Sequence, residues 1–263
     1  MQIRPSKSPK TAARKRFHTP APLNARPGAL PGLIGVLGGM GPLATVDFMR
    51  KMVQATPATR DQDHVPALIS SIPQIPDRTR AFQGRGETPL PALLACAQRL
   101  EAAGAGVIVI PCNTAHLWFD AIQAEIAIPM LHIVDAALKM ASTFIGVTPR
   151  IGLLATEATI ASGLYTHRAH GAAVEWLLPG ASDIREWVTP GIAAVKAGRL
   201  DAGRALLLQA ALALQQRDAA ALVLGCTEIP VVLDDANCPL PTIDATAALA
   251  QGAVDWSRHM RSR

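Results

Sequence analysis

Two cysteines occupy matching positions in the two halves of the chain. Residues 106–116 read GVIVIPCNTAH, and residues 221–228 read ALVLGCTE. In each segment an apolar run typical of a buried strand ends in a small residue or proline, followed by cysteine and a polar residue that can begin a helix. A thiol at such a junction lies near backbone N–H donors and the positive end of a helix dipole, which lowers the pKa of a thiol. Two similar half-structures would bring Cys112 and Cys226 together across one site, where one takes a proton from a carbon and the other returns one to the opposite face.

The rest of the chain supports this twofold organisation. From residue 32 onward, short apolar runs alternate with helical stretches, which is typical of a parallel sheet wrapped by helices. The strands are predicted at 33–37, 67–72, 107–110, 130–133, 151–155, 174–178, 221–224 and 240–244. The helices are predicted at 42–56, 89–103, 114–124, 159–171, 190–197, 201–216 and 245–260.

The predicted fold class is α/β, with two similar lobes, each a mostly parallel sheet flanked by helices, and the active site in the cleft between them. We assign residues 32–131 plus 241–263 to the first lobe and residues 132–240 to the second. Ligands of such sheets bind beyond the carboxyl ends of the strands, where the polar loops of this sequence fall.

The formal net charge of +5 comes from the N-terminal segment. Residues 1–30 hold seven of the 25 basic residues and no acid, so the remainder carries 18 basic against 20 acidic residues. This Pro-rich segment has no helical or strand period, and we predict that residues 1–31 are disordered. The near-neutral remainder and an aromatic content of 4% argue against a nucleic-acid partner.

Several other classes of protein are disfavoured. No apolar run reaches the length of a membrane span. The four cysteines lack C-x-x-C spacing, which argues against a metal site, and a reducing cytoplasm suits them. The glycine-rich loop at 38–42 lacks both the GxGxxG and the Gly-Lys-Ser/Thr signatures, so we expect it to receive a small anion such as a carboxylate at a helix start. Arg78 and Lys196 are the candidate cations of the site. His116 is expected to have a helix-capping or packing role.

Four segments together resemble the aspartate/glutamate racemase superfamily. They are PCNTAH at 111–116, GCTE at 225–228, GGMGP at 38–42 and PQIPDRT at 73–79. The resemblance runs from about residue 33 to 260 and favours the aspartate racemase branch. Glutamate racemases typically carry an Asp-Ser-Gly loop in place of residues 39–41 and histidine in place of Glu228. Ser70 and Ser71 depart from the asparagines that relatives often carry.

The resemblance implies a two-lobed enzyme, often a homodimer, that racemises an acidic amino acid with neither cofactor nor metal. Cys112 and Cys226 take the places of the two catalytic thiols, with Glu228 and Asp77 in supporting roles. Arg78 and Lys196 fall where aspartate racemases grip the side-chain carboxylate. The remaining expected substrate contacts are Met40, Gln74, Asn113, Thr114, Thr156 and Thr227.

Other functions remain open at this point. Within the superfamily they are a broad-specificity amino-acid racemase, a hydantoin racemase and a maleate-type isomerase. Outside it they are a small-molecule sensor without turnover and a redox role in which Cys112 and Cys226 form a regulatory disulfide.

Overall fold

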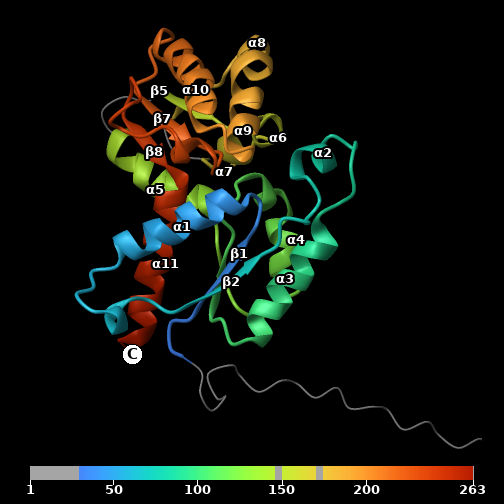
Figure 1. Ribbon diagram of the computed structural model, residues 1–263, viewed down its shortest axis with the longest axis vertical. Helices are drawn as coiled ribbons and strands as arrows, with labels where there is room; N and C mark the ends of the chain where they lie inside the picture. The colour runs from blue at the N-terminus through green and yellow to red at the C-terminus, as the bar shows by residue number, and fades with distance from the viewer. Residues whose placement is uncertain (1–29, 146–149, 170–173, 263) are drawn as a thin grey trace, which may run out of the picture.

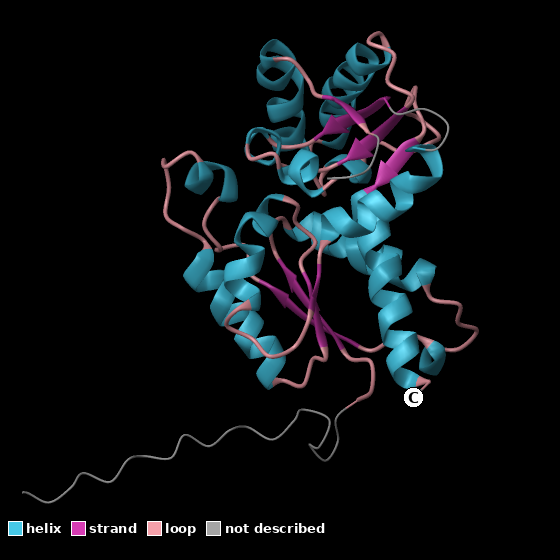
Figure 2. Cartoon of the chain, turned by 180° about the vertical axis from the view of Figure 1, so that it is seen from behind, coloured by secondary structure: helices cyan, strands magenta, loops and turns pink. Residues whose placement is uncertain are grey.

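A computed structural model describes residues 30–145, 150–169 and 174–262. Most of the predicted disordered segment 1–31 therefore lies outside the described residues. The chain forms two lobes, each built on a four-stranded parallel sheet with helices on its faces (Figures 1 and 2). The predicted α/β class with two similar lobes is confirmed.

The first sheet has the strand order β2-β1-β3-β4 and is parallel throughout. Its strands are β1 (Ile34–Gly38), β2 (Ala67–Ser71), β3 (Val107–Val109) and β4 (Met130–Leu131). The helical segments between them are α1 (Pro42–Ala55), η2 (Asp61–Asp63), α2 (Arg78–Phe82), α3 (Leu90–Ala102), η3 (Thr114–Trp118) and α4 (Phe119–Gln123).

The central strands β1 and β3 are buried on both faces, which explains their continuous apolar runs. Side chains alternate between faces along a strand, so Ile34 and Val36 enter a core shared with α1 and α11, while Leu37 enters a second core beneath α3. Figure 2 shows the helices standing on the two sides of this sheet.

The second sheet repeats the arrangement with the order β6-β5-β7-β8. Its strands are β5 (Arg150–Leu154), β6 (Glu175–Leu177), β7 (Ala221–Leu224) and β8 (Thr242–Asp244). The helical segments of this half are α6 (Glu157–Ala161), α7 (Leu164–Arg168), α8 (Ala181–Asp183), η4 (Ile184–Val188), α9 (Thr189–Lys196), α10 (Leu200–Gln215) and η5 (Ile229–Val231).

Two long helices tie the lobes together. α5 (Ile133–Ile145) follows β4 of the first sheet and packs against α11, α7 and the strands β7 and β8 of the second sheet. α11 (Ala245–Arg261) follows β8 of the second sheet and packs against α1 of the first lobe. One hydrophobic core consequently runs through both lobes, from Ile34 and Val36 to Val223 and Ile243.

The predicted division of the chain departs from the structure at one strand. It placed residues 241–263 with the first lobe, but β8 pairs with β7 in the second sheet through Leu222–Thr242 and Leu224–Asp244. α11 alone reaches the first lobe. The physical reason is the repeat itself, because β8 occupies in the second sheet the edge that β4 occupies in the first.

Several helical segments also differ from the sequence prediction. The segment 114–124 is divided into η3 and α4, and the segment predicted at 159–171 is divided at Gly163, whose φ of 68° ends α6 and starts α7. α5 was not predicted, because the apolar run 130–134 continues from strand into helix without a break in polarity. Among the described residues, none of the helices combines the length and apolar character that crossing a membrane requires.

Candidate active site

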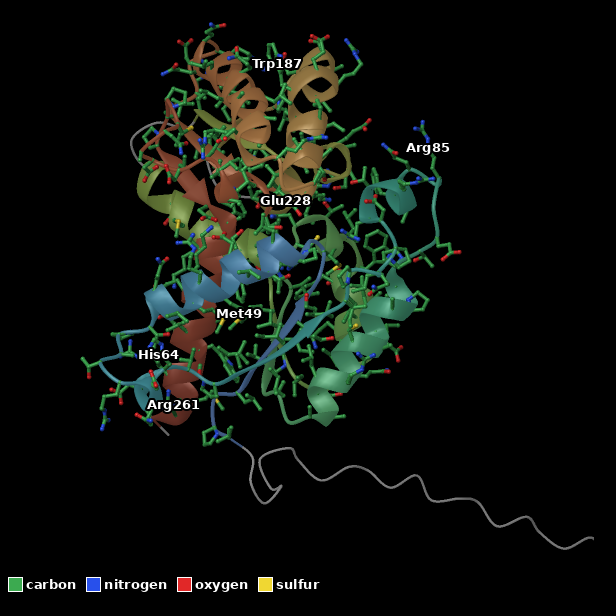
Figure 3. The ribbon with its side chains drawn as sticks, viewed as in Figure 1. Met49, His64, Arg85, Trp187, Glu228 and Arg261 are labelled. Carbon is green, nitrogen blue, oxygen red and sulfur yellow. The ribbon has the colours of Figure 1, made fainter. Side chains whose placement is uncertain are left out.

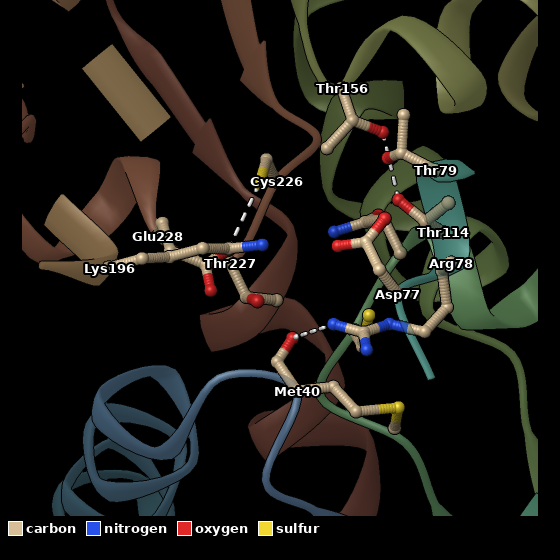
Figure 4. Close-up of a pocket in the computed structure, with 12 residues that line it drawn as sticks. Met40, Asp77, Arg78, Thr79, Thr114, Thr156, Lys196, Cys226, Thr227 and Glu228 are labelled. Atoms are coloured by element: carbon tan, nitrogen blue, oxygen red, sulfur yellow. Dashed lines mark hydrogen bonds between the residues drawn. The ribbon is translucent and has the colours of Figure 1, made fainter. Parts of the chain in front are cut away.

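The carboxyl ends of strands from both lobes meet at one cavity. Its lining comes from the loop after β1, the segment at the start of α2, the loops after β3, β5 and β7, and the end of α9. The lining residues are Met40, Asp77, Arg78, Thr79, Cys112, Asn113, Thr114, Thr156, Lys196, Cys226, Thr227 and Glu228. Figure 4 shows most of them, and Figure 3 shows Glu228 at the level where the lobes meet, far from Trp187 at the outer end of the second lobe.

The structure brings together eleven of the twelve predicted site residues. The exception is Gln74, which lines a wider cavity next to the first, together with Pro42, Leu43, Pro73, Ile75 and Pro76. Asp77, Arg78, Lys196 and Glu228 line both cavities. The inner cavity has a free volume of about 10 Å³, close to that of one water molecule, and the outer one about 460 Å³. An amino acid would reach the inner cavity only if these shared side chains moved.

Cys112 is held by a buried loop that His116 braces. The thiol residue is 6% exposed and lies three residues beyond β3. The carbonyl of Cys112 accepts a hydrogen bond from Nδ1 of His116 at 2.9 Å, and Nε2 of the same ring accepts one from the backbone N–H of Ile133 at 3.2 Å. Burial lowers the pKa of His116 to about 4. The ring is therefore neutral at pH 7, and it has the packing role expected from the sequence.

Cys226 follows β7 through a glycine that the packing requires. A Cβ atom on Gly225 would lie 2.7 Å from Cδ1 of Leu153 and 3.2 Å from Cβ of Ala155. Any larger residue would push the loop that carries the thiol away from β5. Cys226 is 4% exposed, so the packing both positions this sulfur and removes it from water.

The acidity of Cys226 is the opposite of the sequence prediction. Burial, followed by the charge of Glu228, raises the pKa of the Cys226 thiol well above its ordinary value. The predicted lowering by a helix dipole is wrong here, because the element after Cys226 is the single turn η5, which offers no long helix axis. Cys226 therefore keeps its proton in the free protein.

Glu228 connects the second thiol to the first lobe. Its Oε2 accepts a hydrogen bond from Sγ of Cys226 at 3.1 Å, and its Oε1 accepts one from the backbone N–H of Gly41 at 3.2 Å. The carboxylate is 3% exposed. It thus joins the loop after β7 to the glycine loop after β1. That loop was expected to receive a substrate anion, but the glutamate occupies the Gly41 donor.

The two predicted cations reach the cavity from opposite lobes (Figure 4). Arg78 is buried, and its Nη1 donates to the carbonyls of Ile75 at 3.1 Å and Pro76 at 3.0 Å, while Nη2 donates to Met40 at 3.4 Å. Its Nε is buried and has no hydrogen-bond partner among the described residues. This N–H donor is left for a ligand.

Lys196 ends α9 at the border of the two cavities. Desolvation lowers the pKa of its ammonium, but the charges of Glu228, Cys226 and Cys112 outweigh this and leave the pKa raised. Its positive charge is therefore secure at pH 7. Asp77, in contrast, serves as the N-cap of α2, where its Oδ1 accepts the N–H of Arg80 at 2.8 Å.

A ring of three threonine hydroxyls joins the lobes beside the thiols. Oγ1 of Thr114 lies 2.8 Å from that of Thr156 and 3.0 Å from that of Thr159, and the last two are 3.0 Å apart. Thr159 was not predicted, although the i, i+3 spacing of Thr156 and Thr159 at a helix start places both hydroxyls on one face. Tyr165, whose hydroxyl donates to Asn113, was also missed, because a single tyrosine in a helix gives no signal in the sequence.

The two-lobed α/β fold matches that of racemases, which are isomerases that invert a stereocentre, and in this chain a buried thiol from each lobe lines the cavity. The family model for Asp/Glu/hydantoin racemases matches residues 37–253, and the chain belongs to this family.

Relatives with stated activities are similar over most of the chain. The chain is 30% identical to the broad-specificity amino-acid racemase of Bacillus subtilis (strain 168), and the match covers 84% of this chain and 96% of that relative. It is 31% identical to the aspartate racemase of Picrophilus torridus, with a TM-score of 0.76 over 86% of this chain and 94% of that one. A glutamate racemase from Francisella tularensis shares the fold at 17% identity and a TM-score of 0.64, covering 87% of this chain and 81% of that one.

Proposed function

We propose that the protein is an aspartate racemase that inverts the α-carbon by two-thiol chemistry and needs no cofactor. The observation that carries this proposal is that Cys112 and Cys226, from different lobes, line one cavity together with the cations Arg78 and Lys196. Similarity to the aspartate racemase of Picrophilus torridus supports the choice of substrate.

The thiols divide the proton transfer between them. The thiolate of Cys112 takes the α-proton and becomes a thiol, while Cys226 gives its proton to the opposite face of the same carbon and becomes a thiolate. The raised pKa of Cys226 supports its role as the acid in this direction. After inversion, Cys112 is a thiol and Cys226 is a thiolate. Turnover of the opposite enantiomer, or proton exchange with solvent, restores the starting state.

Glu228 assists the return. Its Oε2 already accepts the hydrogen bond of the Cys226 thiol, so it provides a place for that proton when Cys226 must act as the base. The ammonium of Lys196 offsets the negative charge that then gathers on Cys226 and Glu228. Asp77, which caps α2, acts in this proposal by holding the segment that carries Arg78.

The carbanion-like state requires donors around the α-carboxylate. The amide and hydroxyl groups of Asn113, Thr114 and Thr227 lie at the strand ends on either side of the cavity and are fixed before substrate arrives. The unpaired Nε of Arg78 and the ammonium of Lys196 hold the side-chain carboxylate. Met40, Gln74 and Thr156 complete the wall and the approach to the site.

A broad-specificity amino-acid racemase is the second candidate. The outer cavity is lined by apolar residues, including Leu43 and Ile75, and it adjoins the cations. A longer or apolar side chain would extend into it. The relative from Bacillus subtilis carries this activity in its name.

One experiment separates these functions. The purified protein is incubated in deuterium oxide with each enantiomer of aspartate, glutamate and a panel of neutral amino acids, and is analysed by chiral chromatography and mass spectrometry. The proposal expects aspartate to be inverted with one deuterium at the α-carbon. Comparable turnover of neutral amino acids would favour the broad-specificity racemase, and neither inversion nor exchange of any of them would refute both.

A further inference from the structure

Asn113 carries a buried donor that none of the described residues satisfies. The residue is 2% exposed and lines the inner cavity. Its Nδ2 atom is buried and has no hydrogen-bond partner among the described residues. Leaving a buried amide donor unpaired costs about 1–3 kcal/mol. A cavity-lining residue with such a donor is prepared for a ligand that accepts hydrogen bonds.

The opposite end of the same amide is fixed by Tyr165. The phenolic hydroxyl donates to Oδ1 of Asn113 at 2.6 Å, in a bond that joins α7 of the second lobe to the loop after β3 of the first. An amide whose oxygen accepts this bond must turn its NH₂ group the other way. Tyr165 therefore decides which end of the Asn113 side chain is left for the ligand.

Tyr165 is well suited to be a fixed donor. The side chain is fully buried in the core that runs through both lobes, and its ring meets that of Trp176 edge to face at 5.8 Å. Burial, followed by the charges of Cys226 and Asp244, raises the pKa of its hydroxyl, so the group keeps its proton over the whole working range. It has neither the freedom to turn away nor the option to ionise.

We propose that Tyr165 is a positioning residue that holds the Asn113 amide with its NH₂ group toward the α-carboxylate of the substrate. This inference rests on the proposed racemase function and deepens it. Negative charge moves onto the α-carboxylate as the α-proton leaves, so an oriented donor there stabilises the transition state more than the bound substrate. A rotated amide would present its oxygen to the same carboxylate and repel it.

The position of Tyr165 also links the orientation of the Asn113 amide to the contact between the lobes. Because the hydroxyl and the amide belong to different lobes, the NH₂ group of Asn113 is oriented only when the lobes are together.

The test is a double-mutant cycle with Tyr165→Phe and Asn113→Ala. Tyr165→Phe removes only the hydroxyl, and we expect kcat/KM for aspartate to fall roughly tenfold, mainly through kcat, as for the loss of one oriented hydrogen bond. The fold-loss should be the same for any other amino acid that the enzyme accepts, since all share the α-carboxylate. In the Asn113→Ala background Tyr165→Phe should have almost no further effect.

Trp176→Phe is the matched control, because it alters packing around the Tyr165 ring and leaves the hydroxyl in place. If Tyr165→Phe lowered activity equally in both backgrounds, or no more than Trp176→Phe does, Tyr165 would be a packing residue only and the inference would be overturned.

A measurement independent of turnover keeps the two proposals separate. The side-chain amide signals of Asn113 are assigned by nuclear magnetic resonance through their loss in Asn113→Ala, and Tyr165→Phe should shift and broaden them in the ligand-free protein. Unchanged signals would overturn the positioning role, even in a protein that racemises aspartate. If Tyr165→Phe alters these signals but the wild-type protein racemises no amino acid, the orientation of Asn113 by Tyr165 stands and the proposed function is refuted.

Discussion

Sγ of Cys226 lies 3.1 Å from Oε2 of Glu228, and both groups are almost completely buried. The carboxylate accepts a hydrogen bond from the thiol and raises the pKa of that thiol beyond what burial alone does. The other oxygen of the carboxylate accepts a hydrogen bond from the N–H of Gly41 in the opposite lobe. The protonation state of the Cys226 sulfur is thus connected to the contact between the lobes.

Glu228→Gln should make Cys226 more acidic. The amide retains the size of the side chain and removes the negative charge, so the pKa of the thiol should fall toward the value that burial alone allows. The measurement is the pH dependence of Cys226 alkylation in a Cys112→Ser background. Glu157→Gln, at an exposed position on α6, is the control. An alkylation profile that is the same with and without the Glu228 charge would contradict this account of the thiol.

Replacing either cysteine should stop inversion and leave the fold intact. General acid–base groups contribute about 10²–10⁴-fold to rate, so Cys112→Ala and Cys226→Ala should each lose at least that much racemisation. Circular dichroism and thermal unfolding check the fold, and chiral chromatography measures the inversion. Cys96→Ala is the control, because Cys96 is a buried residue of α3 that does not line the site. Full turnover of both enantiomers by either active-site variant would eliminate the two-thiol scheme.

Much of the fold was predictable because the apolar runs are both short and regularly spaced. The strands at 34–38, 67–71 and 150–154 lie within one residue of their predicted ends, since a short apolar run between polar loops marks each of them. α5 was missed because its apolar start continues the strand before it. The exchange of α5 and α11 between lobes is a packing relationship, and no local pattern encodes it.

Site residues that follow strand ends were predictable from the sequence. Residues that act through a neighbouring side chain were not. Cys112 and Cys226 were found because each closes an apolar run. Tyr165 was missed because its role depends on an Asn113 contact between residues 52 positions apart. The raised pKa of Cys226 was also missed, because burial and the direction of the Glu228 carboxylate exist only after folding.

Lys196→Gln should discriminate between substrates. Lys196 is exposed at the border of the two cavities, so the substitution removes charge and leaves the core intact. Hydrogen bonds to charged groups contribute about 1.5–3 kcal/mol, so kcat/KM for aspartate should fall roughly 10- to 100-fold. Alanine, which lacks the side-chain carboxylate, should lose less.

Initial racemisation rates of aspartate and alanine test the effect of Lys196→Gln. Lys139→Gln, at an exposed position of α5, is the charge-matched control. Equal losses for aspartate and alanine would mean that Lys196 acts on the thiol and carboxylate of the second lobe and does not select the substrate.

Acid should destabilise the protein through His116. The pKa of this ring falls from an ordinary value of 6.5 to about 4 because burial opposes the charged form. Between these pH values the unfolded chain binds a proton that the folded protein does not, so the free energy of unfolding rises with pH across this window. The contribution is complete above pH 6.5 and is lost as the pH falls toward 4. Each pKa unit corresponds to about 1.4 kcal/mol, so the loss amounts to about 3 kcal/mol.

Urea unfolding at pH 7 and pH 4.5 measures this effect. His116→Gln should reduce the difference between the two, with a remainder from His132, whose pKa burial lowers to about 2. His259→Gln, at an exposed site on α11, should leave the difference as in the wild type. Because the ring binds the carbonyl of Cys112, racemase activity should fall together with stability as the pH drops. A wild-type protein as stable at pH 4.5 as at pH 7 would show that protonated His116 finds a partner inside the fold, and the bracing role of its neutral ring would then have to be abandoned.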